Sequence, residues 1–321
     1  MLISNPHLLI GALALALLAI KPGTAMSQDL GDRLPRIELP GLSEYAPSTP
    51  TSPMATAGLG RITLTGQLVK DGAEIPKGLV WRVFDTEPGP NGKLRLVASA
   101  RGGTQSFDLA PGQYLVHASY GRAGATKRIS VGSDAKREAF VLDAGGLKLD
   151  AENSGGQRIA SDKLRFSIYE AQEKANGERA LILPDVSPNT VVRLNAGTYH
   201  VVSTYGNVNA VIRSDIKVEA GKLTEATVQH SAAELTLKLV REAGGEAIAD
   251  TSWSVLTTAG DPVRESVGAY ASMVLAEGDY TIVAKNRDHI YQKDFTVAAG
   301  HSQEVEVLAD ETAPTATEGA D

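Results

Sequence analysis

The chain has 321 residues, with 31 Lys and Arg against 38 Asp and Glu, and no cysteine. This length allows two or three domains. The lack of cysteine excludes a disulfide, a thiolate metal site and a cysteine nucleophile, and the net charge of -7 argues against a nucleic-acid partner.

The N-terminal segment predicts export. Leu8 to Ile20 is a run of 13 apolar residues, which is shorter than the roughly 20 needed to span a membrane but typical of a secretory signal peptide. Gly23 and Ala25 suit cleavage after Ala25, so residues 1–25 are predicted to be a signal peptide and the mature protein to be periplasmic or extracellular. No Lys or Arg precedes the run. An uncleaved N-terminus that would retain the protein at a membrane therefore stays open as an alternative.

Two further segments are predicted to be disordered. Residues 26–60 form a linker rich in proline, serine and threonine without an apolar period, and residues 311–321 form a small-residue acidic tail. Such compositions cannot bury enough apolar surface to offset the entropy of ordering the chain. The folded part is therefore expected between these two segments.

Three copies of one pattern fill the folded part. A similar opening begins at Ile62, Leu147 and Leu235, at offsets of 85 and 88 residues. A Gly-x-Tyr motif follows in each copy and ends at Tyr114, Tyr199 and Tyr280. This period is too long for a solenoid repeat and suits a small autonomous domain. The sequence predicts domains at 61–146, 147–234 and 235–310, with almost no linker between them.

Each copy has the pattern of short strands. Apolar and polar residues alternate in stretches such as Leu147-Lys148-Leu149-Asp150, which is the signal of a half-buried strand. Turn-forming pairs such as Asp71-Gly72 and Gly155-Gly156 separate the stretches. No convincing amphipathic helix lies between them. About seven strands per copy predict an all-β protein of three tandem Ig-like antiparallel β-sandwich domains.

One aromatic position recurs in all three copies. Trp81, Phe166 and Trp253 align, and a β-branched residue follows two positions later in each copy. A large apolar residue at one topological site is typical of a sandwich core. We therefore predict core residues, with exposed tryptophans that bind sugar as the alternative.

The motifs "L-x-x-G-x-Y-x-V-x-A" and "F-x-V-x-x-G" of the copies resemble bacterial Ig-like modules, close to the PEGA and carboxypeptidase-regulatory (transthyretin-like) groups. The resemblance covers most of residues 62–309. It implies a spacer or accessory role in cell-envelope or secreted proteins, and it provides no catalytic residues.

A search for chemistry finds no site. The six histidines form no His-x-His or His-x-x-x-His pair, and no nucleophile elbow, phosphate loop or zinc-protease motif occurs. No catalytic, cofactor-binding or metal-binding residue is predicted, no cofactor is expected, and the protein is predicted not to be an enzyme.

Charge differs between the copies. Residues 62–146 hold 11 Lys and Arg against 8 Asp and Glu, whereas residues 235–310 hold 6 against 12. Ordinary solvated strand faces would explain this difference in charge. Head-to-tail self-association of the protein through oppositely charged ends would also explain it. The third explanation is a basic surface that contacts an anionic partner. For that surface the candidates are Arg101, Arg122 and Arg128, while alternation with Ile129 predicts that Lys127 points inward.

Together these features predict an exported, non-enzymatic binding or scaffolding protein of the cell envelope. The expected partner is an envelope protein or an anionic glycan or lipid surface, and the oligomeric state stays open. The alternative is a carbohydrate-binding, adhesin-like protein, with a glycan hydrolase as a third and weaker possibility.

Overall fold

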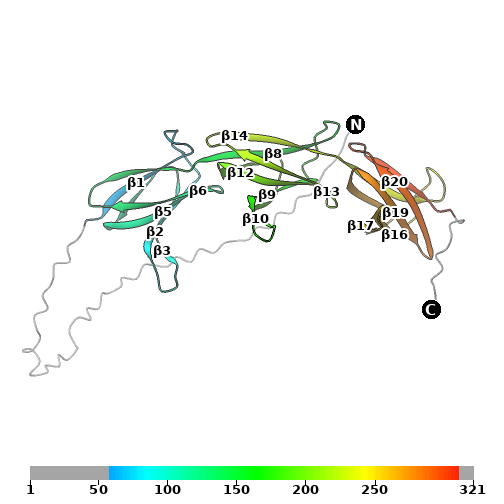
Figure 1. The fold of residues 1–321 in the computed structure, drawn as a ribbon, viewed down its shortest axis with the longest axis horizontal. Helices are drawn as coiled ribbons and strands as arrows, with labels where there is room; N and C mark the ends of the chain where they lie inside the picture. The colour runs from blue at the N-terminus through cyan, green and yellow to red at the C-terminus, as the bar shows by residue number, and fades with distance from the viewer. Residues whose placement is uncertain (1–57, 311–321) are drawn as a thin grey trace, which may run out of the picture. The chain divides into compact units, whose positions relative to one another are not determined.

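A computed structural model of the chain describes residues 58–310, which form strands and turns without a helix. The predicted signal peptide, the predicted acidic tail and nearly all of the predicted linker lie outside the described residues. The strands fall into three groups of seven, coloured in chain order in Figure 1.

Repeat one contains β1 (Gly60–Gln67), β2 (Leu79–Pro88), β3 (Leu94–Gly102), β4 (Gln105–Leu109), β5 (Gly112–Tyr120), β6 (Ala123–Val131) and β7 (Lys136–Val141). Repeat two contains β8 (Ala144–Asn153), β9 (Leu164–Glu173), β10 (Arg179–Val186), β11 (Val191–Asn195), β12 (Gly197–Tyr205), β13 (Ala210–Val218) and β14 (Leu223–His230). Repeat three contains β15 (Ala232–Val240), β16 (Thr251–Thr257), β17 (Pro262–Val267), β18 (Tyr270–Ala276), β19 (Gly278–Asn286), β20 (His289–Val297) and β21 (Gln303–Leu308).

Each repeat is a sandwich of a three-stranded and a four-stranded sheet. In repeat one the sheets have the strand orders β4-β1-β7 and β3-β2-β5-β6. Repeats two and three have the same order, with β11-β8-β14 facing β10-β9-β12-β13 and β18-β15-β21 facing β17-β16-β19-β20. The predicted all-β fold of three tandem sandwiches is therefore confirmed.

The strand order has one feature that the sequence does not reveal. The first and last strands of each repeat are parallel neighbours, as β1 and β7 are, while the other pairs are antiparallel. Constant-type immunoglobulin domains instead join strands A, B, E and D in one sheet and C, F and G in the other. The repeats therefore share the sandwich architecture of that fold with a different internal order.

The recurring aromatic position is the centre of each core. The exposed fraction is 0% for Trp81, 0% for Phe166 and 1% for Trp253. The indole nitrogen of Trp81 donates to the Gly103 carbonyl at 2.8 Å, and that of Trp253 donates to the Gly268 carbonyl at 2.9 Å. A buried indole needs such a partner. The prediction of core residues is confirmed, and these tryptophans offer no surface for a sugar.

The tyrosine of each Gly-x-Tyr motif fixes the turn before its strand. Tyr114 donates its hydroxyl to the carbonyl of Ala110 at 2.9 Å. Tyr199 and Tyr280 make the same bond, also to the carbonyl four residues earlier, at 2.8 and 3.0 Å. This bond ties the start of the fifth strand of each repeat to the end of its fourth strand.

The junctions between repeats are short and bridged by asparagine side chains. At the first junction Asn195 donates its Nδ2 to the carbonyl of Leu142 at 2.6 Å and to that of Gly124 at 3.1 Å. At the second junction the Oδ1 of Asn209 accepts from the Ala276 amide at 3.0 Å, and its Nδ2 donates to the Tyr280 hydroxyl at 2.8 Å. Each repeat is thus hydrogen-bonded to its neighbour.

A glycine at a hairpin tip allows the close approach at each junction. Gly121 and Gly206 have φ angles of 66° and 70°. A Cβ atom on Gly121 would lie 2.9 Å from the Cβ of Arg193, and one on Gly206 would lie 2.7 Å from the Cβ of Val274. The close contact therefore requires glycine, and the positive φ angle favours it. The corresponding tip of repeat three carries the exposed Arg287.

The core assignment predicts the effect of Trp81→Ala. The substitution should lower the free energy of unfolding of repeat one by about 3–5 kcal/mol, because it leaves a cavity and an unpaired carbonyl. Denaturant unfolding followed by circular dichroism measures this. Val267→Ala, at a position that is 76% exposed, is the control and should change little.

The junction geometry predicts that Gly206→Ala is more harmful than Gly177→Ala. Both glycines have positive φ angles, 70° and 79°, so both substitutions carry a backbone cost of about 1–2 kcal/mol. Nothing lies within 4 Å of a Cβ on Gly177. Gly206→Ala should cost about 1–3 kcal/mol more, from overpacking against Val274. Equal losses in calorimetry would contradict the junction contact.

Candidate functional site

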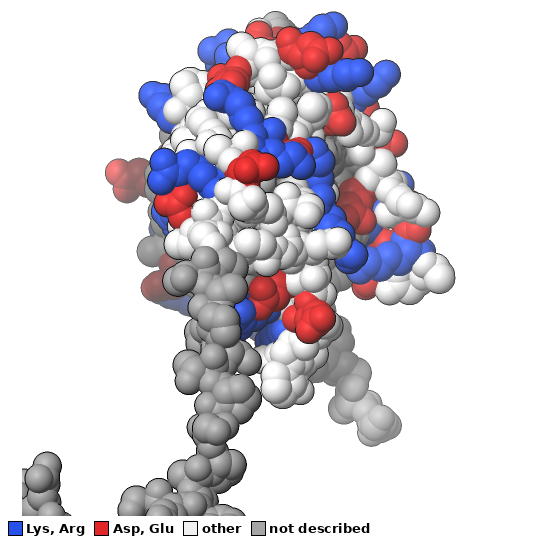
Figure 2. All heavy atoms as spheres, turned by 90° about the vertical axis from the view of Figure 1, so that its left-hand side faces the viewer, with Lys and Arg blue, Asp and Glu red and all other residues white. Residues whose placement is uncertain are grey.

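The three arginines proposed to meet an anionic partner do not form one cluster. Arg101 lies on β3 and Arg128 on β6, at opposite edges of the four-stranded sheet of repeat one. Arg122 lies in the turn between β5 and β6, where its amide donates to the carbonyl of Arg193 at 3.0 Å. All three residues are exposed. In the view from the left of Figure 1, basic and acidic side chains are interspersed (Figure 2).

Lys127 lies apart from these arginines, as alternation predicts. It is paired across the sheet with the buried Val116. Its Nζ is 2.6 Å from a carboxylate oxygen of Glu138 and 5.9 Å from the centre of the Phe140 ring. Hydrogen bonds from Lys127 and Lys136 lower the pKa of Glu138. Lys127 is therefore engaged within its own repeat.

Arg82 is the basic residue that the sequence analysis missed. It follows the buried Trp81 on β2 and therefore points to the outer face of the sheet. Cross-strand pairing places it between Ser99 on β3 and His117 on β5. The sequence "WRVF" already indicated the outward direction of Arg82. Neighbouring strand residues point to opposite faces, so an arginine next to an inward tryptophan points outward.

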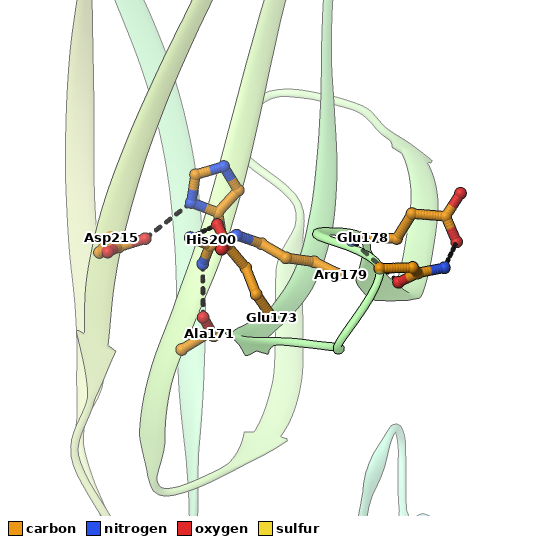
Figure 3. Close-up of polar contacts among 7 residues, drawn as sticks. Ala171, Glu173, Glu178, Arg179, His200 and Asp215 are labelled. Atoms are coloured by element: carbon orange, nitrogen blue, oxygen red, sulfur yellow. Dashed lines mark hydrogen bonds and ion pairs between the residues drawn. The ribbon is translucent and has the colours of Figure 1, made fainter.

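Repeat two carries a polar hollow of about 400 Å³ on its four-stranded sheet. In it His200 on β12 directs its Nδ1 to Asp215 on β13, at 2.7 Å (Figure 3). Arg179 on β10 forms an ion pair with Glu173 at 2.7 Å and donates to the carbonyl of Ala171. The lining consists of Tyr169, Glu173, Gly177, Arg179, His200, Val202 and Arg213.

The side chains that line the hollow offer hydrogen-bonding groups for a polar ligand. A carboxylate on one imidazole nitrogen orients the ring of His200 and leaves its Nε2 for another partner. Nucleophilic catalysis would need a serine, threonine or cysteine within reach of that histidine. The residues that line the hollow include none of these types. Hydrogen bonding through Tyr169, His200 and the arginines is what the arrangement offers.

A second histidine, His230, is buried with a hydroxyl partner. The exposed fraction is 1% for His230 and 0% for Ser203, and the His230 Nε2 lies 2.7 Å from the Ser203 Oγ. The Tyr205 ring packs edge-on against the imidazole, 5.8 Å between centres. Burial lowers the pKa of His230 to about 4. The pair is therefore enclosed in the core of repeat two, away from solvent.

Three general features complete the description of residues 58–310. No group of three or more His, Asp or Glu residues in this part of the chain is arranged to hold a metal ion. Every buried side-chain nitrogen and oxygen in the same range has a hydrogen-bond partner. No described helix is long and apolar enough to cross a membrane.

Comparison with protein families relates the third repeat to a known domain. Residues 234–309 match the Rhizobiales growth-associated tandem repeat domain. The match covers repeat three, and the shared strand order extends its architecture to the other two repeats. The chain is thus a bacterial-type tandem-repeat β-protein. No curated protein matches it.

Several solved structures are distantly similar. The Bacillus anthracis TIE protein is 16% identical with a TM-score of 0.24, and the match covers 78% of this chain and 50% of that one. GBS52, the minor pilin of Streptococcus agalactiae, is 14% identical with a TM-score of 0.31 over 53% of this chain and 95% of that one. BcpA, the major pilin of Bacillus cereus, is 10% identical with a TM-score of 0.20 over 78% and 99%. The match thus spans half the length of the first of these proteins.

The buried histidine predicts a pH dependence of stability. The folded protein keeps His230 neutral down to about pH 4, whereas the unfolded chain takes up a proton near pH 6.5. The unfolded state therefore binds more protons between these values, and stability falls as the pH drops from about 6.5 to about 4, by at most about 3 kcal/mol.

The matched variant is the double substitution His230→Leu with Ser203→Ala. Repeat one has Leu142 and Ala118 at the corresponding positions, both buried. Denaturant unfolding at several pH values should show that the variant loses less stability than the parent between pH 6.5 and 4. Identical pH profiles for the two proteins would contradict the assignment.

Proposed function

We propose that this protein is an exported, non-enzymatic binding or scaffolding element of the bacterial cell envelope, built from Ig-like modules that resemble the PEGA and carboxypeptidase-regulatory groups. The observation that best supports the proposal is the construction of the junctions. Asn195 and Asn209 hydrogen-bond neighbouring repeats, and Gly121 and Gly206 let them approach closely. Bonded modules suit a protein that presents surfaces at fixed positions.

The proposed location and family role agree with this function. A cleaved signal peptide at residues 1–25 would export the chain, and an uncleaved N-terminus would hold it at the membrane. The domain that matches residues 234–309 is described as growth-associated in Rhizobiales. This description supports a proposed role of the protein in bacterial growth.

The proposed partner contacts include the exposed arginines of repeat one. Arg101, Arg122 and Arg128 carry charge without a side-chain partner among the described residues. An exposed guanidinium suits a carboxylate or phosphate, with which it forms paired hydrogen bonds. The partner would be an envelope protein or an anionic glycan or lipid surface.

A carbohydrate-binding, adhesin-like function is the second candidate. The hollow on repeat two favours it, because Tyr169, His200 and Arg213 offer hydrogen-bonding groups in a concave site of about 400 Å³. A few such groups on a partly apolar wall are typical of ligand sites. Loss of glycan binding in His200→Ala, with Arg101, Arg122 and Arg128 intact, would favour this candidate.

Sedimentation with washed bacterial envelopes tests the main proposal. The full exported chain should sediment with the envelopes, and the triple substitution of Arg101, Arg122 and Arg128 to Glu should weaken this severalfold at low salt. A chain that stays soluble under all conditions would contradict an envelope-binding role. Turnover of a panel of envelope glycans would contradict the non-enzymatic assignment.

A further inference from the structure

The outer face of the four-stranded sheet of repeat one is cationic across its width. Residues directly opposite one another on neighbouring strands share a face. Val80, Arg82 and Phe84 of β2 alternate with the buried Trp81 and Val83 and therefore face outward. Pairing with them places on the same face Leu96, Ser99 and Arg101 of β3, and Leu115, His117 and Ser119 of β5. The next pairs add Gly124, Thr126 and Arg128 of β6.

Three arginines cross this face on a diagonal. Arg101 is opposite Val80, Arg82 is two residues further along β2, and Arg128 is in the row of Phe84, two residues further again. With strands about 4.8 Å apart and a rise of about 3.4 Å per residue, the Cα atoms of Arg101 and Arg82 are about 8 Å apart and those of Arg82 and Arg128 about 12 Å. The whole diagonal is about 20 Å long by the same geometry.

These charges are uncompensated within the described residues. Arg82, Arg101 and Arg128 are exposed and form no side-chain hydrogen bond or ion pair there. None of the residues that the pairing places on the face is acidic. Burial first, and then the charge of Arg82, lower the pKa of His117. The second of these effects reflects the positive potential at the centre of the face.

The face is specific to repeat one, although all three repeats have the same sheet. The position of Arg128 is occupied by Asp215 in repeat two and by Asp294 in repeat three. In repeat three the positions of Arg82 and Arg101 are occupied by Ser254 and Val267. One scaffold therefore carries a cationic line in the first repeat and acidic groups at a corresponding place in the others.

We propose that this face binds a linear, carboxylate-bearing polysaccharide that lies along the diagonal from Arg101 through Arg82 to Arg128. The proposal rests on the proposed envelope-binding function and names the class of its ligand. A single small anion cannot meet all three arginines, because the Cα atoms at the two ends of the line are about 20 Å apart. An extended polymer with repeated carboxylates can meet all three, each as a bidentate pair.

The groups between the arginines favour a glycan over a membrane. Ser99, His117, Thr126 and Ser119 provide hydrogen-bonding side chains. His117 Nδ1 and Thr126 Oγ1 are hydrogen-bonded to each other at 2.9 Å. The hydroxyl groups of a polysaccharide, which lie between its carboxylates, can form hydrogen bonds with these side chains. Proteins that enter the membrane interface present several protruding aromatic and aliphatic side chains. On this face Phe84 and Leu115 are partly buried, and Leu96 is exposed at 50%.

The test measures binding of the full chain to polygalacturonate, a linear carboxylated polysaccharide, with neutral dextran as the uncharged comparison. Arg82→Gln should weaken binding to polygalacturonate about tenfold at low salt, as expected for the loss of one charge-assisted pair. Arg82→Gln with Arg128→Gln should weaken it further. Monomeric galacturonate should compete far less well than the polymer.

Arg137→Gln is the matched control. It removes the same charge from the same repeat, but Arg137 lies on β7 in the opposite sheet and is paired with Glu74 at 2.7 Å. It should change the affinity less than twofold, which is within the effect expected of a distant surface charge. Unchanged thermal unfolding of all variants confirms that the fold is intact.

Several results would overturn the proposal. Equal losses for Arg82→Gln and Arg137→Gln would show a response to net charge rather than to a site. Equal binding to dextran, or equal competition by the monomer, would exclude a linear polyanion. If the arginine face binds phosphatidylglycerol vesicles and does not bind the polymer, its ligand is a membrane surface and not a polysaccharide. If the chain still sediments with envelopes while Arg82→Gln has no effect, this inference fails and the envelope-binding function stands.

Discussion

The parallel pairing of the first and last strands is the constraint on which the rest of each repeat depends. In β1 with β7, β8 with β14 and β15 with β21 the two strands run in the same direction. The chain therefore leaves a repeat at the end opposite to the one where it entered. Only Leu142 and Asp143 separate β7 from β8, and only Ser231 separates β14 from β15. The next repeat must then begin against the hairpin tip of the previous one.

That proximity explains the residues at the tips. Gly121 and Gly206 each lie close to a Cβ atom of the following repeat. A side chain on either glycine would overlap with that atom. In repeat three Arg287 occupies this place with a φ of 55° and is exposed. The glycine is thus needed for packing against a neighbour and not for the hairpin itself. A sequence pattern of Tyr-Gly at the tip marks a packed junction in this chain.

The sequence predicted the architecture because the architecture depends on short-range patterns. Alternation of period two showed which strand residues are buried, and the aligned Trp81, Phe166 and Trp253 showed where the core lies. Strand order could not be predicted in this way, because β1 pairs with β7 through residues more than 70 positions apart. Local alternation shows to which side of the sheet a side chain points. It does not show which residues of other strands lie beside that side chain.

The same limit explains why the arrangement of the exposed arginines could not be predicted. Arg101, Arg122 and Arg128 were selected by composition, but their distribution over two sheet edges and a turn depends on register. Arg82 was missed, although its outward direction follows from Trp81, because its position between Arg101 and Arg128 requires the pairing of three strands. The buried pair of His230 and Ser203 had no local signal at all. It becomes visible only when their strands face each other across the core.

The three repeats keep one kind of core, whereas the charges on their outer faces differ. Inward positions vary little in character: Trp, Phe and Trp at one site, and Val116, Val201 and Ile282 at another. An outward position on the neighbouring edge strand changes sign, from Arg128 on β6 to Asp215 on β13 and Asp294 on β20. An exposed substitution of this kind costs little folding free energy, whereas it reverses the sign of the charge available to a partner. Each repeat can therefore keep the core and junctions of the chain while the charge of its outer sheet face changes, and repeat one carries the line of three arginines.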